Sequence, residues 1–169
     1  MTRIRTVIVS VVAVLSALVV ATPAQADPRI VTFTYANAYT GKCLDVSWAS
    51  RDNLGPLNQW DCYGGANQQF QEQWVGTDTY LLRAWHSGKC LEPKYALTTI
   101  DTPIIQYDCH GARHQQWRRL WKQDNTFLWQ NLHSGKCLEI DVIRNTGALQ
   151  YDCNGGAFQK WRYERSFTY

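Results

Sequence analysis

The sequence has almost no excess of charge of either sign. It carries 17 basic and 14 acidic residues, and two of the basic ones are Arg3 and Arg5, so the chain beyond them holds 15 against 14. Proteins that bind nucleic acid or an anionic membrane through phosphate groups need a clear cationic surplus. The near balance argues against both partners.

The chain also lacks an apolar run long enough to span a bilayer. The run from Val7 to Val20 is shorter than the roughly 20 residues that a spanning helix needs. It follows two arginines and precedes the small residues Ala24-Gln25-Ala26, which is the pattern of a secretory signal peptide. We therefore expect residues 1–26 to be a signal peptide, the protein to be secreted and extracellular, and no segment to insert into a membrane.

No linker, low-complexity stretch or helical periodicity interrupts the remaining chain. Its length of about 143 residues suits one domain with a usable core. Short β-prone runs alternate with turn residues. We predict that residues 27–169 form a single all-β domain and that the protein is a monomer.

Two short motifs each occur three times in the sequence. Gly-Lys-Cys-Leu followed by an acid begins at Gly41, Gly88 and Gly135, and Gln-aromatic-Asp-Cys begins at Gln59, Gln106 and Gln150. Repetition at a fixed spacing defines the architecture before any other feature does. We expect three repeats, at about residues 33–75, 80–122 and 127–165.

The six cysteines fall two to a repeat. In a secreted chain they indicate a disulfide framework, for which 15 pairings are possible. Pairing inside each repeat keeps the threefold pattern, and each closed loop would stabilise the fold by about 3 kcal/mol in the chain-entropy model. The predicted disulfides are Cys43–Cys62, Cys90–Cys109 and Cys137–Cys153.

Zinc is an alternative use of one cysteine. Cys109-His110 and the nearby His114 offer zinc ligands in the second repeat. The other two repeats have no matching histidines, so a metal does not explain the repeated cysteines. We expect no metal and no cofactor.

Each repeat is predicted to contain four short strands. An aromatic residue opens the first strand, and a glycine turn leads into the second at Cys-Leu. The third strand covers residues 57–61, 104–108 and 148–152, and the fourth follows a turn rich in Gly and Ala. Twelve strands in a closed threefold unit protect their edges and match a β-trefoil, with six strands in a barrel and three hairpins capping one end.

A Gln-x-aromatic triplet closes each repeat, in register with both cysteine motifs: Gln68-Gln69-Phe70, Gln115-Gln116-Trp117 and Gln159-Lys160-Trp161. Over about Phe33 to Tyr163 the chain thereby resembles the ricin-type β-trefoil lectin family. The resemblance implies that the glutamine supports a site from behind while the aromatic residue packs in the core. The first repeat departs from the pattern by having Phe70 for tryptophan, which should affect packing rather than function.

The resemblance further implies a lectin with one shallow candidate site per repeat. A sugar offers hydroxyls and a C–H face, which a carboxylate, an amide and an aromatic ring can bind. The family places these groups after Cys-Leu, four and two residues before the second cysteine, and just before the triplet. In the first repeat this set is complete, with Asp45, Asn58, Trp60 and Asn67, and Gln68 behind them.

The other two repeats are predicted to bind more weakly. The second supplies Glu92, Tyr107, His114 and Gln115, with Ile105 in place of an amide and Pro93 after the acid. The third supplies Glu139, Tyr151 and Gln159, with Leu149 and Phe158 at both amide positions and Asp141 as a substitute acid. We expect the second site to be weak or altered and the third to be silent or much weaker.

The sequence leaves the sugar open among galactosides, xylan or arabinan fragments, and mannosides. Catalysis is not expected, because equivalent acids on a threefold barrel lie farther apart than the about 5 to 10 Å between glycosidase carboxylates. A protein-binding trefoil is the main alternative, as a secreted inhibitor or as the binding subunit of a multichain toxin or enzyme. Its candidate anchors are Trp48 with Arg51, and the group Arg113, Arg118 and Arg119.

Overall fold

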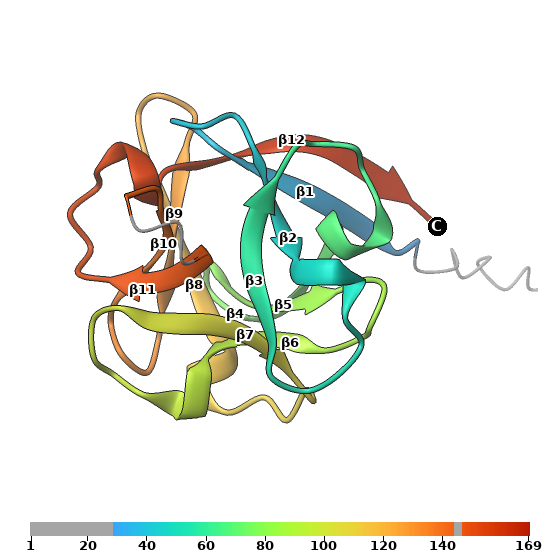
Figure 1. The fold of residues 1–169 in the computed structure, drawn as a ribbon, viewed down its shortest axis with the longest axis horizontal. Helices are drawn as coiled ribbons and strands as arrows, with labels where there is room; N and C mark the ends of the chain where they lie inside the picture. Colours follow the sequence, from blue (N-terminus) through green and yellow to red (C-terminus); the bar gives the residue numbers. More distant parts are fainter. Residues whose placement is uncertain (1–28, 144–146) are drawn as a thin grey trace, which may run out of the picture.

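A computed structural model describes residues 29–143 and 147–169. The predicted signal peptide, residues 1–26, lies outside the described residues. Within these ranges the chain forms 12 β-strands and five short 3-10 helices (Figure 1). No helix of the described part is both long and apolar enough to cross a membrane. The all-β prediction is confirmed.

The strands follow one another in three sets of four. The first set is β1 (Val31–Asn37), β2 (Cys43–Val46), β3 (Gly55–Trp60) and β4 (Phe70–Gly76). The second is β5 (Thr79–Ala84), β6 (Cys90–Pro93), β7 (Thr102–Tyr107) and β8 (Gln116–Trp121). The third is β9 (Phe127–Asn131), β10 (Cys137–Asp141), β11 (Gly147–Tyr151) and β12 (Trp161–Thr168). This order is consistent with the three predicted repeats.

Six of the strands pair in a closed antiparallel ring. β1 pairs with β12 and β4, β5 pairs with β4 and β8, and β9 pairs with β8 and β12. Closure leaves the ring without a free edge. Val31 lies opposite Thr168, and Figure 1 shows the C-terminal end of β12 beside β1. These two strands extend beyond the predicted repeat bounds because they pair with each other.

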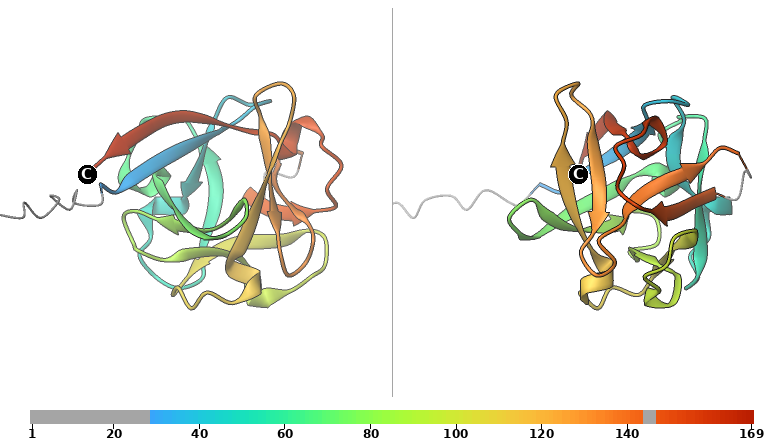
Figure 2. Two further views of the ribbon diagram at one scale, coloured as in Figure 1. Left: turned by 180° about the vertical axis from the view of Figure 1, so that it is seen from behind. Right: turned by 90° about the vertical axis from the view of Figure 1, so that its left-hand side faces the viewer.

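The other six strands form three hairpins, β2–β3, β6–β7 and β10–β11 (Figure 2). The hairpins contact one another through β3–β7 and β7–β11 pairing. Within each hairpin the acid after Cys-Leu lies directly opposite the residue four positions before the second cysteine. These pairs are Asp45–Asn58, Glu92–Ile105 and Glu139–Leu149. Strand pairing therefore brings together the groups that the family resemblance assigns to a site.

The third strand of each repeat differs slightly from its predicted bounds. β3, β7 and β11 begin one or two residues earlier and end one residue earlier than predicted. The aspartate of each Gln-aromatic-Asp-Cys motif thus lies outside the strand, where it meets the repeated lysine. The pairs are Lys42–Asp61 at 3.5 Å, Lys89–Asp108 at 2.5 Å and Lys136–Asp152 at 2.6 Å. Such exposed ion pairs contribute little stability.

The turn that precedes each Cys-Leu strand depends on glycine. Gly41, Gly88 and Gly135 have φ of 70°, 73° and 71°. A side chain is disfavoured in this left-handed region, whereas glycine enters it without steric cost. The turn leads into the strand that carries the first cysteine. The three predicted disulfides are confirmed, with Cα atoms 5.1, 5.0 and 5.0 Å apart.

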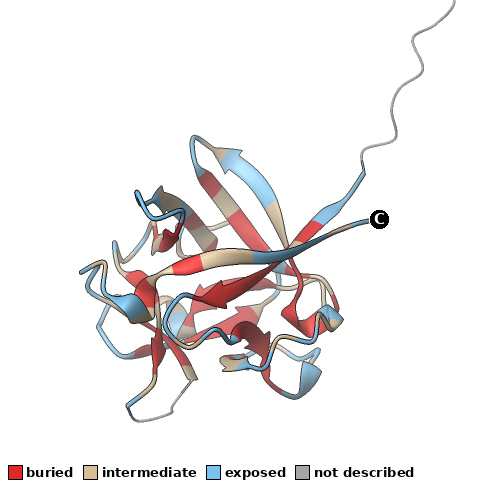
Figure 3. Cartoon of the chain, turned by 90° about the horizontal axis from the view of Figure 1, so that it is seen from above, coloured by how far each residue is buried: buried red, intermediate tan, exposed pale blue. Residues whose placement is uncertain are grey.

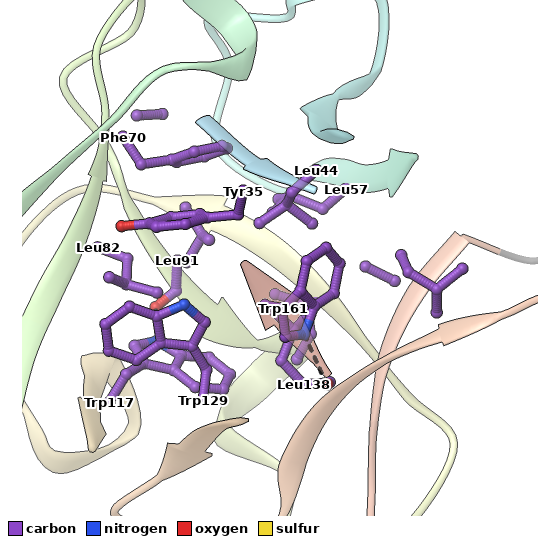
Figure 4. Close-up of a cluster of buried hydrophobic side chains, with 14 of the residues drawn as sticks. Tyr35, Leu44, Leu57, Phe70, Leu82, Leu91, Trp117, Trp129, Leu138 and Trp161 are labelled. Carbon is purple, nitrogen blue, oxygen red and sulfur yellow. Dashed lines mark hydrogen bonds between the residues drawn. The ribbon is translucent and has the colours of Figure 1, made fainter. Parts of the chain in front are cut away.

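The repeated leucines and the triplet aromatics form the core, as predicted. The residues without exposed surface include Leu44, Leu91, Leu138, Phe70, Trp117 and Trp161 (Figure 4). Figure 3 shows that buried residues lie mainly on the strands, while the loops are largely exposed. One hydrophobic core therefore holds all three repeats together.

Tryptophan and phenylalanine are not equivalent in this core. The Trp117 indole donates to the Leu91 carbonyl at 2.9 Å, and the Trp161 indole donates to the Leu138 carbonyl at 3.2 Å (Figure 4). Phe70 has no N–H group and instead stacks on Tyr35, with ring centroids 5.7 Å apart. The departure of the first repeat from Gln-x-Trp is thus a packing difference.

A buried ion pair and its hydrogen bonds connect five strands of the barrel. Arg119 Nη1 lies 2.7 Å from Glu72 Oε2, and the hydroxyls of Tyr163 and Tyr35 donate to Glu72 Oε1 at 2.6 and 3.0 Å. Arg119 Nη2 donates to the Tyr80 hydroxyl at 2.6 Å. The Arg119 side chain is only 12% exposed. The prediction of Arg119 as an anchor for a protein partner is therefore wrong, because its charge is used inside the barrel.

Candidate functional site

The first repeat forms a depression lined by the predicted residues. Its wall consists of Asp45, Trp48, Ala49, Asn58, Trp60, Tyr63 and Asn67. Four of these are the predicted acid, ring and amides. Gln68 has no exposed surface and lies behind the acid, as predicted. Residues from β2, β3 and the two following turns thus meet in one place.

The carboxylate of Asp45 is held by three amide groups. Asn67 Nδ2 and Gln68 Nε2 donate to Asp45 Oδ2 at 2.9 and 3.0 Å. With its amide nitrogen toward the acid, Asn58 lies 3.2 Å from Oδ1 and 3.0 Å from the Asp45 carbonyl oxygen. A carboxylate has about four acceptor positions. Three are occupied by the protein, which leaves one for a hydroxyl of a ligand.

The Asp45 side chain is largely buried, with 5% of the residue exposed. Burial raises the pKa of Asp45 to about 6, while the hydrogen bonds from Gln68 and Asn67 act in the opposite direction. The carboxylate therefore accepts hydrogen bonds above about pH 6 and becomes protonated below it.

The glutamine behind the site is satisfied by the protein alone. Gln68 Oε1 accepts from the backbone N–H groups of Tyr63 and Gly64, and Nε2 also donates to the Asp61 carbonyl at 3.0 Å. Gln115 and Gln159 make the same four kinds of bond in their repeats. The glutamine thus fixes the direction of the acid and of the turn after the second cysteine, and it is a positioning residue.

Three aromatic rings surround the acid of the first repeat. Trp48 is 89% exposed and Trp60 is 59% exposed, and Tyr63 lies beside them. Trp48 and Ala49 have φ of 56° and 49°, a left-handed backbone that costs about 1–2 kcal/mol per residue without glycine. Strain of this kind is concentrated at functional sites. A strained turn therefore holds a tryptophan in the open beside Asp45.

The sequence motifs predict no part in sugar binding for two of these rings. Trp48 is predicted only as an anchor of a protein-binding surface, and no motif identifies Tyr63. The Tyr63 hydroxyl donates to Asn67 Oδ1 at 2.6 Å, which leaves Asn67 Nδ2 to face the acid. The position of Tyr63, directly after the second cysteine and before a glycine turn, was the available signal.

The second repeat forms a similar depression with different chemistry. It is lined by Leu54, Glu92, Tyr95, Ala96, Tyr107, His110 and His114. Gln115 Nε2 donates to Glu92 Oε2 at 2.7 Å, as Gln68 does to its acid. Ile105 is 2% exposed and is not part of the lining, so no amide takes the place of Asn58. The predicted Glu92, Tyr107 and His114 do come together.

The third repeat combines two acids with apolar side chains. Its depression is lined by Glu139, Ile140, Asp141, Val142, Ile143, Tyr151 and Phe158. Phe158 packs edge-on against Tyr39, with ring centroids 5.0 Å apart. Asp141 lies in the wall, where its Oδ1 accepts a hydrogen bond from the Ile143 N–H. No side-chain amide is found among these lining residues.

The three depressions have similar sizes. Their volumes are about 290, 330 and 340 Å³ from the first repeat to the third. The difference between the sites therefore lies in the lining and not in the room for a ligand.

A closed six-stranded ring with three hairpins, each carrying an acid held by a buried glutamine, defines a β-trefoil of the lectin type. The chain belongs to the ricin-type beta-trefoil lectin domain family, which it matches over residues 31–161.

Solved structures agree with this assignment. The chain is 33% identical to the designed threefold-symmetric protein ThreeFoil, covering 79% of this chain and 98% of that one, with a TM-score of 0.76. It is 27% identical to the exo-β-1,3-galactanase 1,3Gal43A from Clostridium thermocellum, covering 80% of this chain but only 30% of the galactanase, with a TM-score of 0.75. The Rhizoctonia solani agglutinin shares the fold at 17% identity, with a TM-score of 0.69 over 82% of this chain and 96% of the agglutinin.

Proposed function

We propose that the protein is a secreted lectin that binds carbohydrate chiefly through its first repeat. The observation that carries this proposal is the Asp45 carboxylate, buried at the base of a depression whose walls are exposed aromatic rings and amides. The N-terminal pattern of residues 1–26 and the three disulfides support secretion. The protein is proposed to act as a monomer.

Each group of the first repeat has a role in the proposed binding. A sugar hydroxyl donates to the open acceptor position of Asp45, and the Trp60 ring lies against the C–H face of the sugar. Trp48 supplies a second apolar wall, and Asn58 and Asn67 orient the acid. A single shallow site of this kind binds at about millimolar affinity, or roughly 4 kcal/mol.

The second and third repeats are proposed to add little to this binding. Glu92, Tyr107 and His114 of the second repeat lack the amide opposite the acid. Glu139 and Tyr151 of the third repeat lie beside Leu149 and Phe158 at the positions where the first repeat has amides. Linked sites increase avidity only when more than one binds. The protein alone is therefore expected to bind weakly.

No catalytic reaction is proposed for this site. Among the lining residues of the first depression, Asp45 is the one carboxylic acid. Glycoside hydrolysis uses two carboxyl groups about 5 to 10 Å apart. The site is therefore suited to binding and not to cleavage.

Galactosides are the first sugars to test. The galactanase to which the chain is similar acts on β-1,3-galactan, as its name states, and the shared part is the trefoil. Xylan and arabinan fragments and mannosides use the same carboxylate, ring and amide groups. They form the other arms of the test.

A glycan array that includes these four classes tests the proposal. We expect binding to at least one class, loss of that binding in Asp45→Ala, and retention in the matched variant Glu139→Ala. If no glycan binds, or if Asp45→Ala binds glycans as well as the parent protein does, the lectin proposal fails. The alternative of a protein-binding trefoil is then favoured.

A further inference from the structure

The second repeat differs from the others by placing two imidazoles beside its acid. His110 directly follows the second cysteine, and His114 directly precedes the triplet glutamine. At these two positions the first repeat has Tyr63 and Asn67, and the third has Asn154 and Phe158. The same backbone frame therefore carries a different donor set in this repeat.

The three donor groups of the second repeat converge on a small volume. His110 Nε2 and His114 Nε2 each lie 3.6 Å from Glu92 Oε2. One donor atom from each of the three residues lies within 4.8 Å of the other two. Tetrahedral bonds of about 2.1 Å place donor atoms about 3.4 Å apart. The two carboxylate–imidazole separations are close to this value, and the exposed His110 side chain has room to complete the third.

We propose that Glu92, His110 and His114 bind one divalent transition-metal ion, with Zn²⁺ as the first candidate. Imidazole nitrogens suit Zn²⁺, Co²⁺, Ni²⁺ and Cu²⁺, whereas Ca²⁺ and Mg²⁺ prefer oxygen ligands throughout. Three protein ligands leave a coordination position open to water.

This site differs from the zinc alternative that the sequence alone offered. That alternative used Cys109, whose sulfur is bonded to Cys90. The third ligand is instead Glu92, which lies two residues after Cys90 in the sequence. The hairpin brings it next to the histidines, and no spacing rule along the chain links these residues.

Hydrogen bonds around the site hold its ligands in place. Gln115 Nε2 donates to Glu92 Oε2 at 2.7 Å, and Gln115 Oε1 accepts from the His110 backbone N–H at 2.9 Å. Asn131 Nδ2 donates to the His114 carbonyl at 2.8 Å. The bond to Glu92 acts on a ligand side chain, and such bonds orient metal ligands and increase affinity. The other two bonds fix the backbone that carries the histidines. In the first repeat the equivalent glutamine holds Asp45, the acid proposed to bind sugar. In the second repeat this arrangement preorganises the proposed metal ligands.

Metal binding has one identifiable cost. His110 Nδ1 accepts a hydrogen bond from the Ala112 N–H at 3.3 Å. An ion on Nε2 leaves the remaining ring proton on Nδ1, so this bond is broken. The bond is long and exposed, and water can replace it, so the cost is small.

The proposal is tested by titrating ZnCl₂ into purified protein that carries no polyhistidine tag, with heat as the readout. We expect one saturable site per chain and no comparable binding of CaCl₂ or MgCl₂. His114→Ala and His110→Ala should each weaken binding by about tenfold or more. Co²⁺ should give visible absorption bands typical of low coordination number in the parent and lose them in both variants.

His133→Ala is the matched control. The His133 ring lies 6.1 Å from the His114 ring, and His133 is exposed and not among the proposed ligands. We expect it to retain Zn²⁺ affinity, and thermal melting establishes that each variant is folded. The proposal is overturned by an absence of saturable binding, by unchanged binding in both ligand variants, or by an equal loss in His133→Ala. These outcomes do not depend on sugar binding by the first repeat.

Discussion

The first and third repeats share the same arrangement of acid and buried glutamine but differ in the side chains around the acid. In both, a buried glutamine donates to the acid at 3.0 or 2.8 Å and accepts from two backbone N–H groups after the second cysteine. Around this frame, Asn58 and Asn67 of the first repeat are replaced by Leu149 and Phe158. The repeated motifs thus specify the position of an acid, while residues outside the motifs give each acid different neighbours. Under the proposed function, these neighbours decide whether the acid can bind a sugar.

The second repeat extends the comparison in another direction. It keeps the frame but places two imidazoles near the acid. The three similar repeats thus differ in their linings: the first has two amides, the second has two imidazoles, and the third has neither. Four predictions test this interpretation, from the largest expected effect to the smallest.

The largest of these four effects is expected from removing the ring beside Asp45. Trp60→Ala should weaken sugar binding by about tenfold to a hundredfold, because it removes the surface against which the C–H face packs. Tyr151→Ala, the equivalent change in the third repeat, should alter the affinity less than twofold. Both affinities can be measured by titration calorimetry with the sugar identified on the array. Equal losses in the two variants would remove the distinction between the repeats.

The affinity of the first repeat should fall at acidic pH. Binding uses the carboxylate form, and burial raises the pKa of Asp45 to about 6. The carboxylate is present above this value and is lost as the pH falls through it, so affinity at pH 5 should be about tenfold lower than at pH 8. Near-UV circular dichroism at both values checks that the fold persists. A constant affinity over this range would show that the charge of Asp45 is not needed.

Rebuilding the second lining should produce a smaller gain. In an Asp45→Ala background, the combined changes Glu92→Asp, Ile105→Asn and His114→Asn give the second repeat the acid and the two amides of the first. We expect sugar binding to rise several-fold above the background because the acid regains its amide donors. The same background with Ile105→Leu is the control. No gain in the rebuilt protein would mean that residues outside the compared set determine binding.

The smallest effect on sugar binding is expected from a change in the core. Trp161→Phe should lower the free energy of unfolding by about 1–2 kcal/mol, since it removes the hydrogen bond to the Leu138 carbonyl and some packing. Sugar binding should be unchanged. Phe70 shows that the fold accommodates phenylalanine at the equivalent position. Denaturant unfolding measures the difference, and a lost sugar affinity in this folded variant would contradict a purely structural role.

Much of the fold could be predicted because residues that recur in each repeat determine it. The glycine turns, the disulfides and the buried triplet aromatics each follow from a local motif with one physical cause, such as the positive φ of Gly41. The burial of Arg119 could not be predicted, because its partner Glu72 lies in a distant strand of the barrel. No local pattern connects those two residues.

The site could be predicted in part for the same reason. Asp45, Asn58 and Trp60 are adjacent across one hairpin, so the motif spacing is enough to place them together. The exposure of Trp48 depends on a left-handed turn without glycine, which the sequence does not signal. The convergence of Glu92 with His110 and His114 depends on how a turn folds back over a strand.

The tryptophan indole signals can show whether sugar binds chiefly to the first repeat. Trp48 and Trp60 line the first depression, and no tryptophan lines the second or third. During titration of ¹⁵N-labelled protein with the sugar, we expect the indole signals of Trp48 and Trp60 and the backbone signals of the first repeat to shift together at about millimolar concentration. Shifts of equal size and affinity around Glu139 and Tyr151, or shifts there alone, would contradict the account.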